Sequence, residues 1–147
     1  MGVGMRMETY RTNSAEETEA LGRRLAARLD VGDLVALEGE LGAGKTVLVR
    51  GIASGLGLAD ERMVSSPTYV LVQEYPGTVT VFHVDLYRVR GGAEEVADLA
   101  LPEMLAEGVV LVEWAERAGG ALPRPHWRVA IRATGVESRD VTVERVE

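Results

Sequence analysis

One glycine-rich segment has the composition and spacing of a phosphate-binding loop. Residues 39–46, Gly-Glu-Leu-Gly-Ala-Gly-Lys-Thr, match the pattern G-x-x-x-x-G-K-T, with an apolar run before them and a helical pattern after them. Glycines let the backbone wind round a phosphate with its N–H groups pointing inward, and the following helix adds the positive end of its dipole. Lys45 is then expected to reach the β- and γ-phosphates, and the Thr46 hydroxyl to bind Mg²⁺. The segment therefore predicts nucleotide binding rather than an accidental glycine-rich turn.

Lysine usage narrows the choice of nucleotide. The chain has 16 basic residues, and Lys45 is its single lysine. Codon usage or habitat accounts for most of the arginine excess, but one retained lysine indicates a position that needs a compact ammonium group. The guanine-reading motif of GTPases, Asn/Thr-Lys-x-Asp, requires a second lysine. ATP is therefore favoured over GTP.

Two carboxylates stand where a metal-binding partner of the loop is expected. A loop of this type needs an acidic residue at the end of a neighbouring strand. Glu113 follows the apolar run Val109–Val112, and Asp85 ends a β-rich segment. Strand-end carboxylates are commonly just solvated, but the loop brings a cation that needs ligands. Both residues are therefore candidates.

Three other features allow two interpretations each. Residues 65–68, Ser-Ser-Pro-Thr, form either a loop that senses the γ-phosphate through its hydroxyls or an ordinary turn. His83 is expected to be a strand residue rather than a base. Trp114 is expected to lie in the core rather than to stack on a nucleotide.

The elements that must position these groups are indicated by the apolar pattern. A capping box begins at Ser14, and the leucines after it share one face, so a helix is expected from about Ala15 to Leu29. A buried strand over residues 34–37 leads into the loop. A second helix follows the loop and ends near Gly55 or Gly57.

The second half of the chain is expected to be richer in strands. We predict a hairpin (69–75 and 78–85, joined by Pro76-Gly77), a helical segment (93–108, with Pro102 opening a second short helix and Gly108 ending it), a central strand (109–112) and a closing antiparallel edge pair (127–133 and 140–146). Helices interspersed with strands indicate an α/β fold, and the two hairpins make its central sheet mixed and partly antiparallel.

Composition bounds the class of protein. The 147 residues (15.8 kDa) suit one domain spanning 1–147, and no apolar run approaches the roughly 18 residues of a membrane span. Cysteine is absent and the first residues lack the apolar segment of a secretory signal, so we expect a cytoplasmic protein that does not contact membranes. The net charge of −7 argues against a broad basic face for nucleic acid. Any link to RNA should run through a partner.

Several segments, taken in their order and spacing, resemble one known family. They are residues 39–46, Val49-Arg50-Gly51, Ser66-Pro67-Thr68-Tyr69 with Leu71-Val72, His83-Val84-Asp85-Leu86-Tyr87-Arg88, Val112-Glu113-Trp114-Ala115-Glu116-Arg117 and Leu122-Pro123. Together they resemble the bacterial TsaE ATPases, also known as YjeE, which take part in making threonylcarbamoyladenosine in tRNA. The phosphate-binding loop is generic, whereas the Ser-Pro-Thr, Asp-Leu-Tyr-Arg and Glu-Trp segments together are specific.

The resemblance implies a three-layer P-loop NTPase fold and an ATPase that is weak in isolation. It also implies action in a complex with TsaB and TsaD, in which TsaD transfers the threonylcarbamoyl group to tRNA and ATP hydrolysis supports turnover. Carried over by position, the phosphates would be cradled by Leu41, Gly42, Ala43, Gly44, Lys45 and Thr46. Thr46 and Glu113 would bind Mg²⁺, and Asp85 would act near the γ-phosphate and its attacking water.

The remaining carried-over positions surround the nucleotide. Ser66, Pro67 and Thr68 would form a switch, Trp114 would lie close to the nucleotide, and Thr18 and Gly135 would line its base or ribose. Glu40 departs from the Asp that the family usually shows.

Two other functions could use the same loop. A small-molecule kinase would need an acceptor pocket and an Arg-bearing lid, and no Arg-rich insertion occurs between Gly108 and Pro125. A binding module would hold ATP without hydrolysing it. Replacing Asp85 by Ala separates that module from an ATPase, because only the ATPase would lose its function.

Overall fold

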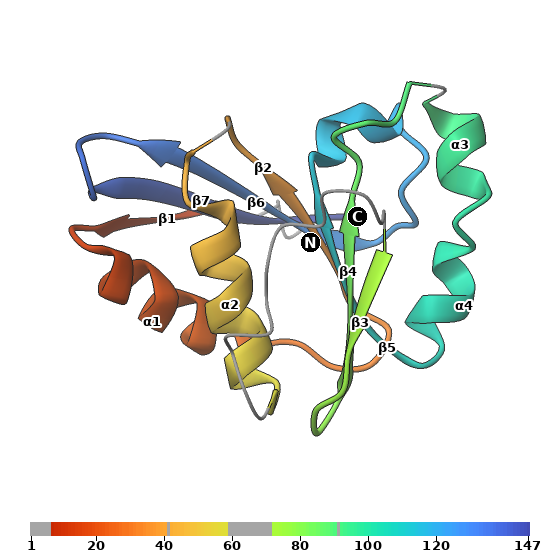
Figure 1. The fold of residues 1–147 in the computed structure, drawn as a ribbon, viewed down its shortest axis with the longest axis horizontal. Coiled ribbons are helices and arrows are strands. Elements are labelled where there is room, and N and C mark those ends of the chain that lie inside the picture. Colours follow the sequence, from red (N-terminus) through yellow and green to blue (C-terminus); the bar gives the residue numbers. More distant parts are fainter. Residues whose placement is uncertain (1–6, 41, 59–71, 91) are drawn as a thin grey trace, which may run out of the picture.

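A seven-stranded mixed sheet forms the centre of the molecule, with helices on both faces (Figure 1). The computed structural model describes residues 7–40, 42–58, 72–90 and 92–147. The strands are β1 (Met7–Thr12), β2 (Leu34–Glu38), β3 (Val72–Tyr75), β4 (Thr80–Asp85), β5 (Gly108–Glu113), β6 (His126–Ala133) and β7 (Arg139–Val146). The helices are α1 (Ala15–Ala26), α2 (Lys45–Gly55), α3 (Ala93–Ala97), α4 (Leu101–Leu105) and the short 3₁₀ helix η2 (Ala115–Ala118).

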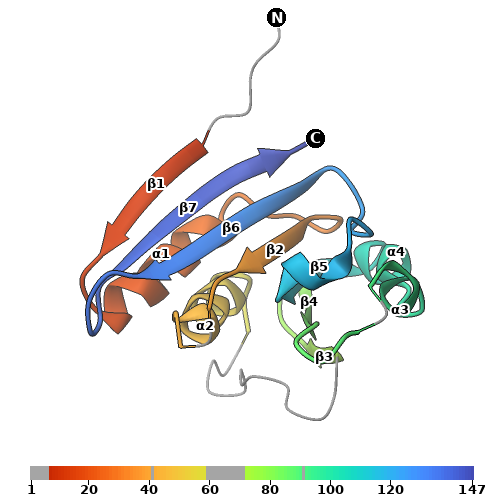
Figure 2. The same ribbon diagram turned by 90° about the horizontal axis from the view of Figure 1, so that it is seen from above.

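The strand order β1-β7-β6-β2-β5-β4-β3 places the parallel strands in the middle of the sheet. β2 pairs in parallel with β5 and β6, and β4 pairs in parallel with β5, whereas the β1–β7, β6–β7 and β3–β4 pairs are antiparallel. Figure 2 shows α1 and α2 on one face and α3 and α4 on the other. The predicted three-layer α/β fold with a mixed sheet is therefore confirmed.

Helix α1 begins as its capping box predicts. The Glu17 N–H donates to Ser14 Oγ (3.1 Å), and the Glu17 carboxylate accepts from the Asn13 N–H (2.8 Å). These bonds satisfy N–H groups that have no partner within the helix. The helix ends at Ala26, short of the predicted Leu29.

Helices α1 and α2 pack closely because glycine lies at their contact. A Cβ added to Gly22 of α1 would lie 2.6 Å from the Leu48 carbonyl oxygen and 2.9 Å from the Ile52 nitrogen of α2. Both are main-chain atoms that cannot turn aside. The two helices together cover the sheet face that carries Val35 and Leu37 of β2.

The opposite face of the central strands builds a second core. All six residues of β5 are buried, as its continuous apolar run predicts. Val110 and Val112 of β5 pack with Phe82 and Val84 of β4 beneath α3 and α4. The alternate residues of β4 and β5 therefore face α2. Asp85 and Glu113, the last residues of the two strands, belong to this set and lie on the side of the sheet that carries the loop.

Two expectations were wrong in detail. The strand β1 was not predicted, and it, rather than the β6–β7 pair, forms that edge of the sheet. Gly108 begins β5 instead of ending a helix, because its N-terminal neighbours complete the turn after α4. The predicted hairpin is confirmed as the antiparallel pair β3 and β4, and residues 69–71 of its expected first strand lie outside the described part of the chain. Within the described residues, no helix is both long and apolar enough to span a bilayer.

Candidate functional site

The glycine-rich loop joins β2 to α2, as predicted, and bends through left-handed backbone at two described glycines. Gly42 has φ +79° and Gly44, which precedes α2, has φ +100°. Such angles are strained for residues with a side chain, so glycine is required here. The first N–H groups of α2 therefore face the loop with no side-chain cap.

The ammonium of Lys45 is turned back onto its own loop. Lys45 Nζ donates to the carbonyl oxygens of Gly39 and Glu40, and lies 3.9 Å from the centre of the Trp114 ring. The side chain is 5% exposed. Burial lowers the pKa of Lys45, and the negative charge of Glu113 opposes that change more than any other neighbour does. The amine is thus held by weak acceptors that an anion could replace.

The two candidate carboxylates lie side by side at the carboxyl edge of the sheet. The parallel register pairs Asp85 with Glu113 and Glu113 with Leu37, the residue before the last of β2. Asp85 is 8% exposed and Glu113 is 3% exposed. Asp85 Oδ1 accepts the Tyr87 N–H at 2.8 Å. Burial raises the pKa of Asp85, and the Tyr87 hydrogen bond opposes the rise.

The partner of Glu113 was not predicted from the sequence. His83 Nε2 lies 2.5 Å from Glu113 Oε2, and His83 Nδ1 lies 3.1 Å from the Tyr75 hydroxyl. His83 is a strand residue, as expected, but it shares the face of β4 that carries Asp85. The spacing of two residues between His83 and Asp85 could have shown that His83 faces the same side of the sheet as Asp85, but not that its partner is Glu113.

Trp114 follows Glu113 in the chain and has a φ of +58°. Its side chain packs with one aromatic and one cationic neighbour, Tyr87 and Arg117. Its ring lies 5.0 Å from that of Tyr87, and the Arg117 guanidinium lies over both rings. Arg117 Nη1 also donates to the Tyr87 carbonyl at 2.6 Å. Trp114 is therefore half-buried and packs against the second core rather than lying within it, and Lys45 Nζ lies over its ring.

A small cavity lies beside the start of α2, where α1 and the β6–β7 turn approach it. Its volume is about 50 Å³, and Thr18, Gly44, Val47 and Arg139 are among its lining residues. The Thr18 hydroxyl is bonded to Thr12 Oγ1 (2.7 Å) and to the Ser14 carbonyl. Thr18 thus lies beside the start of α2, with its hydroxyl already engaged.

Arg139 ties the β6–β7 turn to the loop, and no sequence pattern indicated it. Its Nε donates to the Ala43 carbonyl at 2.7 Å, and its Nη1 donates to the Gly135 carbonyl at 3.2 Å. Arg139 therefore links Gly135 to the loop, and Gly135 itself is not among the residues that line the small cavity.

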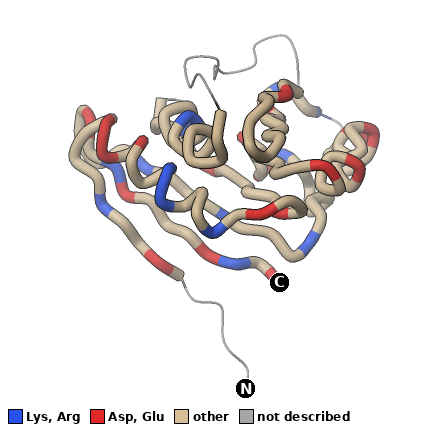
Figure 3. Tube along the Cα trace, turned by 90° about the horizontal axis from the view of Figure 1, so that it is seen from below, with Lys and Arg blue, Asp and Glu red and all other residues tan. Residues whose placement is uncertain are grey.

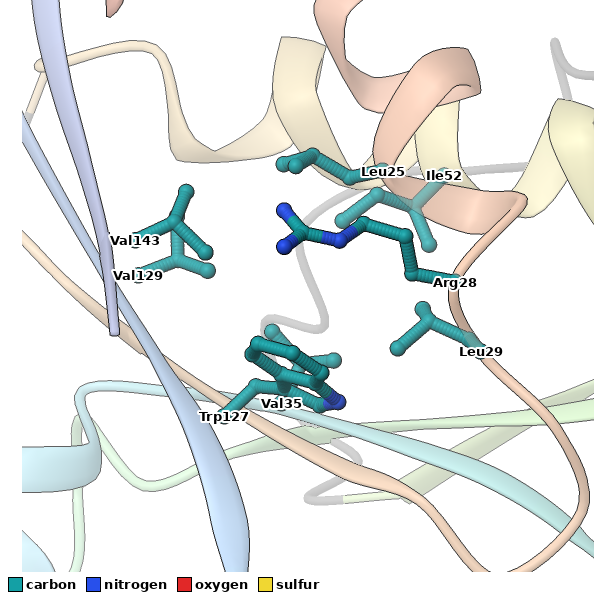
Figure 4. Close-up of a pocket in the computed structure, with 8 residues that line it drawn as sticks. All are labelled: Leu25, Arg28, Leu29, Val35, Ile52, Trp127, Val129 and Val143. Atoms are coloured by element: carbon teal, nitrogen blue, oxygen red, sulfur yellow. The ribbon is translucent and has the colours of Figure 1, made fainter. Parts of the chain in front are cut away.

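Two other hollows differ in character. A groove of about 710 Å³ runs from Gly39 and Glu40 along the open face of β6 and β7, past Arg132 and Asp140. Figure 4 shows a pocket between α1 and β6, where Arg28 lies over Trp127. Its volume is about 10 Å³, room for about one water molecule, so it is part of the core.

The donor set at the loop fits a magnesium ion held together with phosphates. Mg²⁺ binds through one or two protein oxygens, substrate phosphates and water, not a full protein cage. Thr46 lies in the first turn of α2, and Glu113 ends the neighbouring strand. The described residues contain no group of three or more His, Asp or Glu that could hold a metal alone. Leu41, Ser66, Pro67 and Thr68 lie outside the described residues.

Comparisons with known proteins agree with one another. A family model described as "Threonylcarbamoyl adenosine biosynthesis protein TsaE" matches residues 12–141. The chain is 39% identical to the "tRNA threonylcarbamoyladenosine biosynthesis protein TsaE" of Bacillus subtilis (97% of this chain, 88% of that protein) and 45% identical to that of Streptomyces coelicolor (84% and 86%). Its fold is similar to the crystal structure of Bacillus subtilis YdiB, with a TM-score of 0.77, 32% identity, and coverage of 99% of this chain and 90% of that chain.

Proposed function

This chain belongs to the TsaE family, and from this premise we propose that it is a Mg²⁺-dependent ATP-binding and hydrolysing protein of tRNA threonylcarbamoyladenosine synthesis. One observation carries the proposal. Lys45, Asp85 and Glu113 come from three elements and face one another at the mouth of the glycine-rich loop, where Asp85 and Glu113 contribute to the electrostatic environment of Lys45. A buried ammonium, two strand-end carboxylates and a helix N-terminus form the set of groups that phosphoryl transfer from ATP requires.

The loop residues would bind the triphosphate. N–H groups of Gly42, Gly44 and the first turn of α2 would hold its oxygens, and Lys45 would exchange the carbonyls of Gly39 and Glu40 for phosphate. Thr46 and Glu113 would hold Mg²⁺, which neutralises charge on the leaving phosphates when it is bound.

Asp85 would orient the attacking water. Its side chain is fixed by the Tyr87 N–H and is shielded from solvent, so it can hold a small molecule in one geometry. Burial raises the pKa of this carboxyl, which makes it a better proton acceptor than an ordinary aspartate.

The small cavity beside α2 would receive the sugar or the near edge of the base. Thr18 and Gly44 line it from two sides, and Arg139 closes it from the β6–β7 turn. Trp114 lies at the other end of the loop, beside Lys45. The phosphates of the nucleotide would therefore lie near Trp114, and its sugar or base would lie near Thr18.

The charge distribution supports an indirect role toward tRNA. The chain carries a net charge of −7. Figure 3 shows acidic residues and no basic ones along α3 and α4. Such a surface repels a phosphate backbone. We propose that contact with tRNA is made by the partners TsaB and TsaD, and that ATP hydrolysis by this chain supports their turnover.

Binding and hydrolysis can be tested separately. Isothermal titration calorimetry with ATP and Mg²⁺ should show strong binding of ATP to the native protein. In Lys45→Ala the affinity for ATP should fall at least tenfold. Asp85→Ala should keep ATP binding but lose hydrolysis, with Arg128→Ala, on the far side of the sheet, as a control that keeps both. Retained function of the Asp85 variant would indicate a binding module instead.

The role in tRNA modification needs reconstitution. Supplied with ATP and an activated threonylcarbamoyl donor, TsaB, TsaD and tRNA should form threonylcarbamoyladenosine over several turnovers with this chain, and stall without it or with Lys45→Ala. ATP hydrolysis should be faster with TsaB and TsaD than without them. Equal hydrolysis rates, or turnover that does not need this chain, would refute the proposed role.

A further inference from the structure

A series of hydrogen-bonded polar side chains runs from Gln73 of β3 to Glu113, and it is buried from Tyr75 onward. Gln73 Oε1 accepts the Tyr75 hydroxyl at 2.5 Å, the same hydroxyl lies 3.1 Å from His83 Nδ1, and His83 Nε2 lies 2.5 Å from Glu113 Oε2. Tyr75, His83 and Glu113 are 4%, 0% and 3% exposed. The antiparallel register pairs Gln73 with His83, so this series of side chains crosses three neighbouring strands, β3, β4 and β5.

These hydrogen bonds leave His83 no role as a base. Both ring nitrogens are engaged, one with Glu113 and the other with Tyr75, and the side chain has no exposed surface. A general base must reach the proton that it takes, directly or through one water. His83 therefore acts on the chemistry only through Glu113.

The contact between His83 and Glu113 involves one carboxylate oxygen. An ionised carboxylate only accepts, so the hydrogen on this contact comes from His83 Nε2. Among the described residues, the hydrogen bond to the Glu113 carboxylate is made at Oε2, by His83. The imidazole thus fixes the rotation of the carboxyl group and leaves Oε1 for another ligand.

We propose that His83, held in turn by Tyr75, is a positioning residue that sets the orientation of Glu113 toward Mg²⁺. The inference rests on the proposed function, in which Glu113 is a magnesium ligand. Groups that hydrogen-bond a metal ligand without touching the metal fix its orientation, and their loss costs about 10–100-fold in metal affinity.

The test measures magnesium affinity directly. Trp114 is adjacent to Glu113, so its fluorescence in a Trp127→Phe background should report Mg²⁺ added to the protein–ADP complex. His83→Ala should weaken apparent Mg²⁺ affinity by about 10–100-fold, with ADP affinity in EDTA unchanged. His83→Gln offers its amide N–H in place of Nε2 and should restore most of the loss.

Tyr75→Phe provides a variant that keeps the packing. It removes one hydroxyl, leaves the His83–Glu113 contact possible, and should give a smaller loss of Mg²⁺ affinity than His83→Ala. Should His83→Ala fail to fold, His83→Leu takes its place in the comparison with His83→Gln and Tyr75→Phe, because leucine fills the space of the ring and cannot donate to Glu113.

Two results would overturn the inference: unchanged Mg²⁺ affinity in the folded variants that lose the His83 donor, or a His83→Gln protein no better than those variants. Failure of the proposed function looks different. In that case the native protein itself would show no Mg²⁺-dependent change in ADP binding, and Glu113→Gln would behave as the native protein does.

Discussion

The contact between α1 and α2 makes a sharp prediction about Gly22. Replacing it by Ala adds a Cβ 2.6 Å from the Leu48 carbonyl oxygen, whereas ordinary contact begins near 3.4 Å. Because the opposing atoms are main chain, the helices must separate by about 0.8 Å, a gap that loses a quarter to a half of the dispersion energy across the contact.

The magnitude follows from two opposing effects. Overpacking a well-packed contact costs about 1–3 kcal/mol, and the three main-chain atoms that lie 2.6, 2.9 and 3.0 Å from the added Cβ place Gly22 in the upper part of that range, about 2–3 kcal/mol. Alanine is a better helix former than glycine by about 1 kcal/mol. We therefore expect Gly22→Ala to lower the free energy of unfolding by about 1–2 kcal/mol, and the melting temperature by about 2–8 °C for a chain of this length.

Urea unfolding followed by circular dichroism measures this difference. Ser54→Ala, also on the α1–α2 layer but without a main-chain clash, is the matched control and should change stability by less than about 0.5 kcal/mol. A Gly22→Ala protein as stable as the native one, or more stable, would show that helix propensity prevails and that the helices do not approach as closely as described.

Three further outcomes are expected. Ser14→Ala should lower the unfolding free energy by about 1 kcal/mol in urea, because the Glu17 N–H loses its cap; an unchanged value would mean that Glu17 alone caps the helix. Burial raises the folded-state pKa of Asp85, so this group favours folding below its unfolded-state pKa, and that contribution is lost as pH rises through the folded-state pKa. Asp85→Asn should therefore melt above the native protein at neutral pH but not in strong acid, and an equal difference at both pH values would contradict the assignment. Arg139→Ala should weaken ATP binding at least about tenfold, because a charged hydrogen bond to the Ala43 carbonyl contributes about 1.5–3 kcal/mol; titration calorimetry that finds equal affinity, or full recovery in Arg139→Lys, would show that the fork of Arg139 does not hold the loop.

Local patterns predicted most of the fold. β5 was found because a continuous apolar run indicates a strand covered on both faces, and α1 because its cap is encoded by neighbours in sequence. β1 was missed because its less exposed positions carry Glu8, Tyr10 and Thr12, so the segment alternates in burial but shows no apolar alternation in its sequence. The placement of β6 beside β2 also escaped prediction, since pairing between distant strands depends on the whole sheet.

The same distinction applies to the site. Lys45 and the glycines were predicted as candidate site residues from a contiguous motif, and Asp85 and Glu113 from their position at strand ends. The contacts of His83 with Glu113 and of Arg139 with Ala43 join residues 30 and 96 positions apart. Periodicity assigns a residue to a face, but it does not select its partner on another strand.

The conformation of Lys45 bears on where nucleotide affinity comes from. A buried ammonium without partners would be costly, and the carbonyls of Gly39 and Glu40 and the ring of Trp114 offset that cost in this structure. Under the proposed function, Lys45 exchanges these partners for phosphate oxygens rather than gaining partners where it had none. The net contribution of Lys45 to affinity is then smaller than that of a bare charge. The loop N–H groups and the bound metal must supply the remainder, which makes the orientation of Glu113 by His83 consequential for binding.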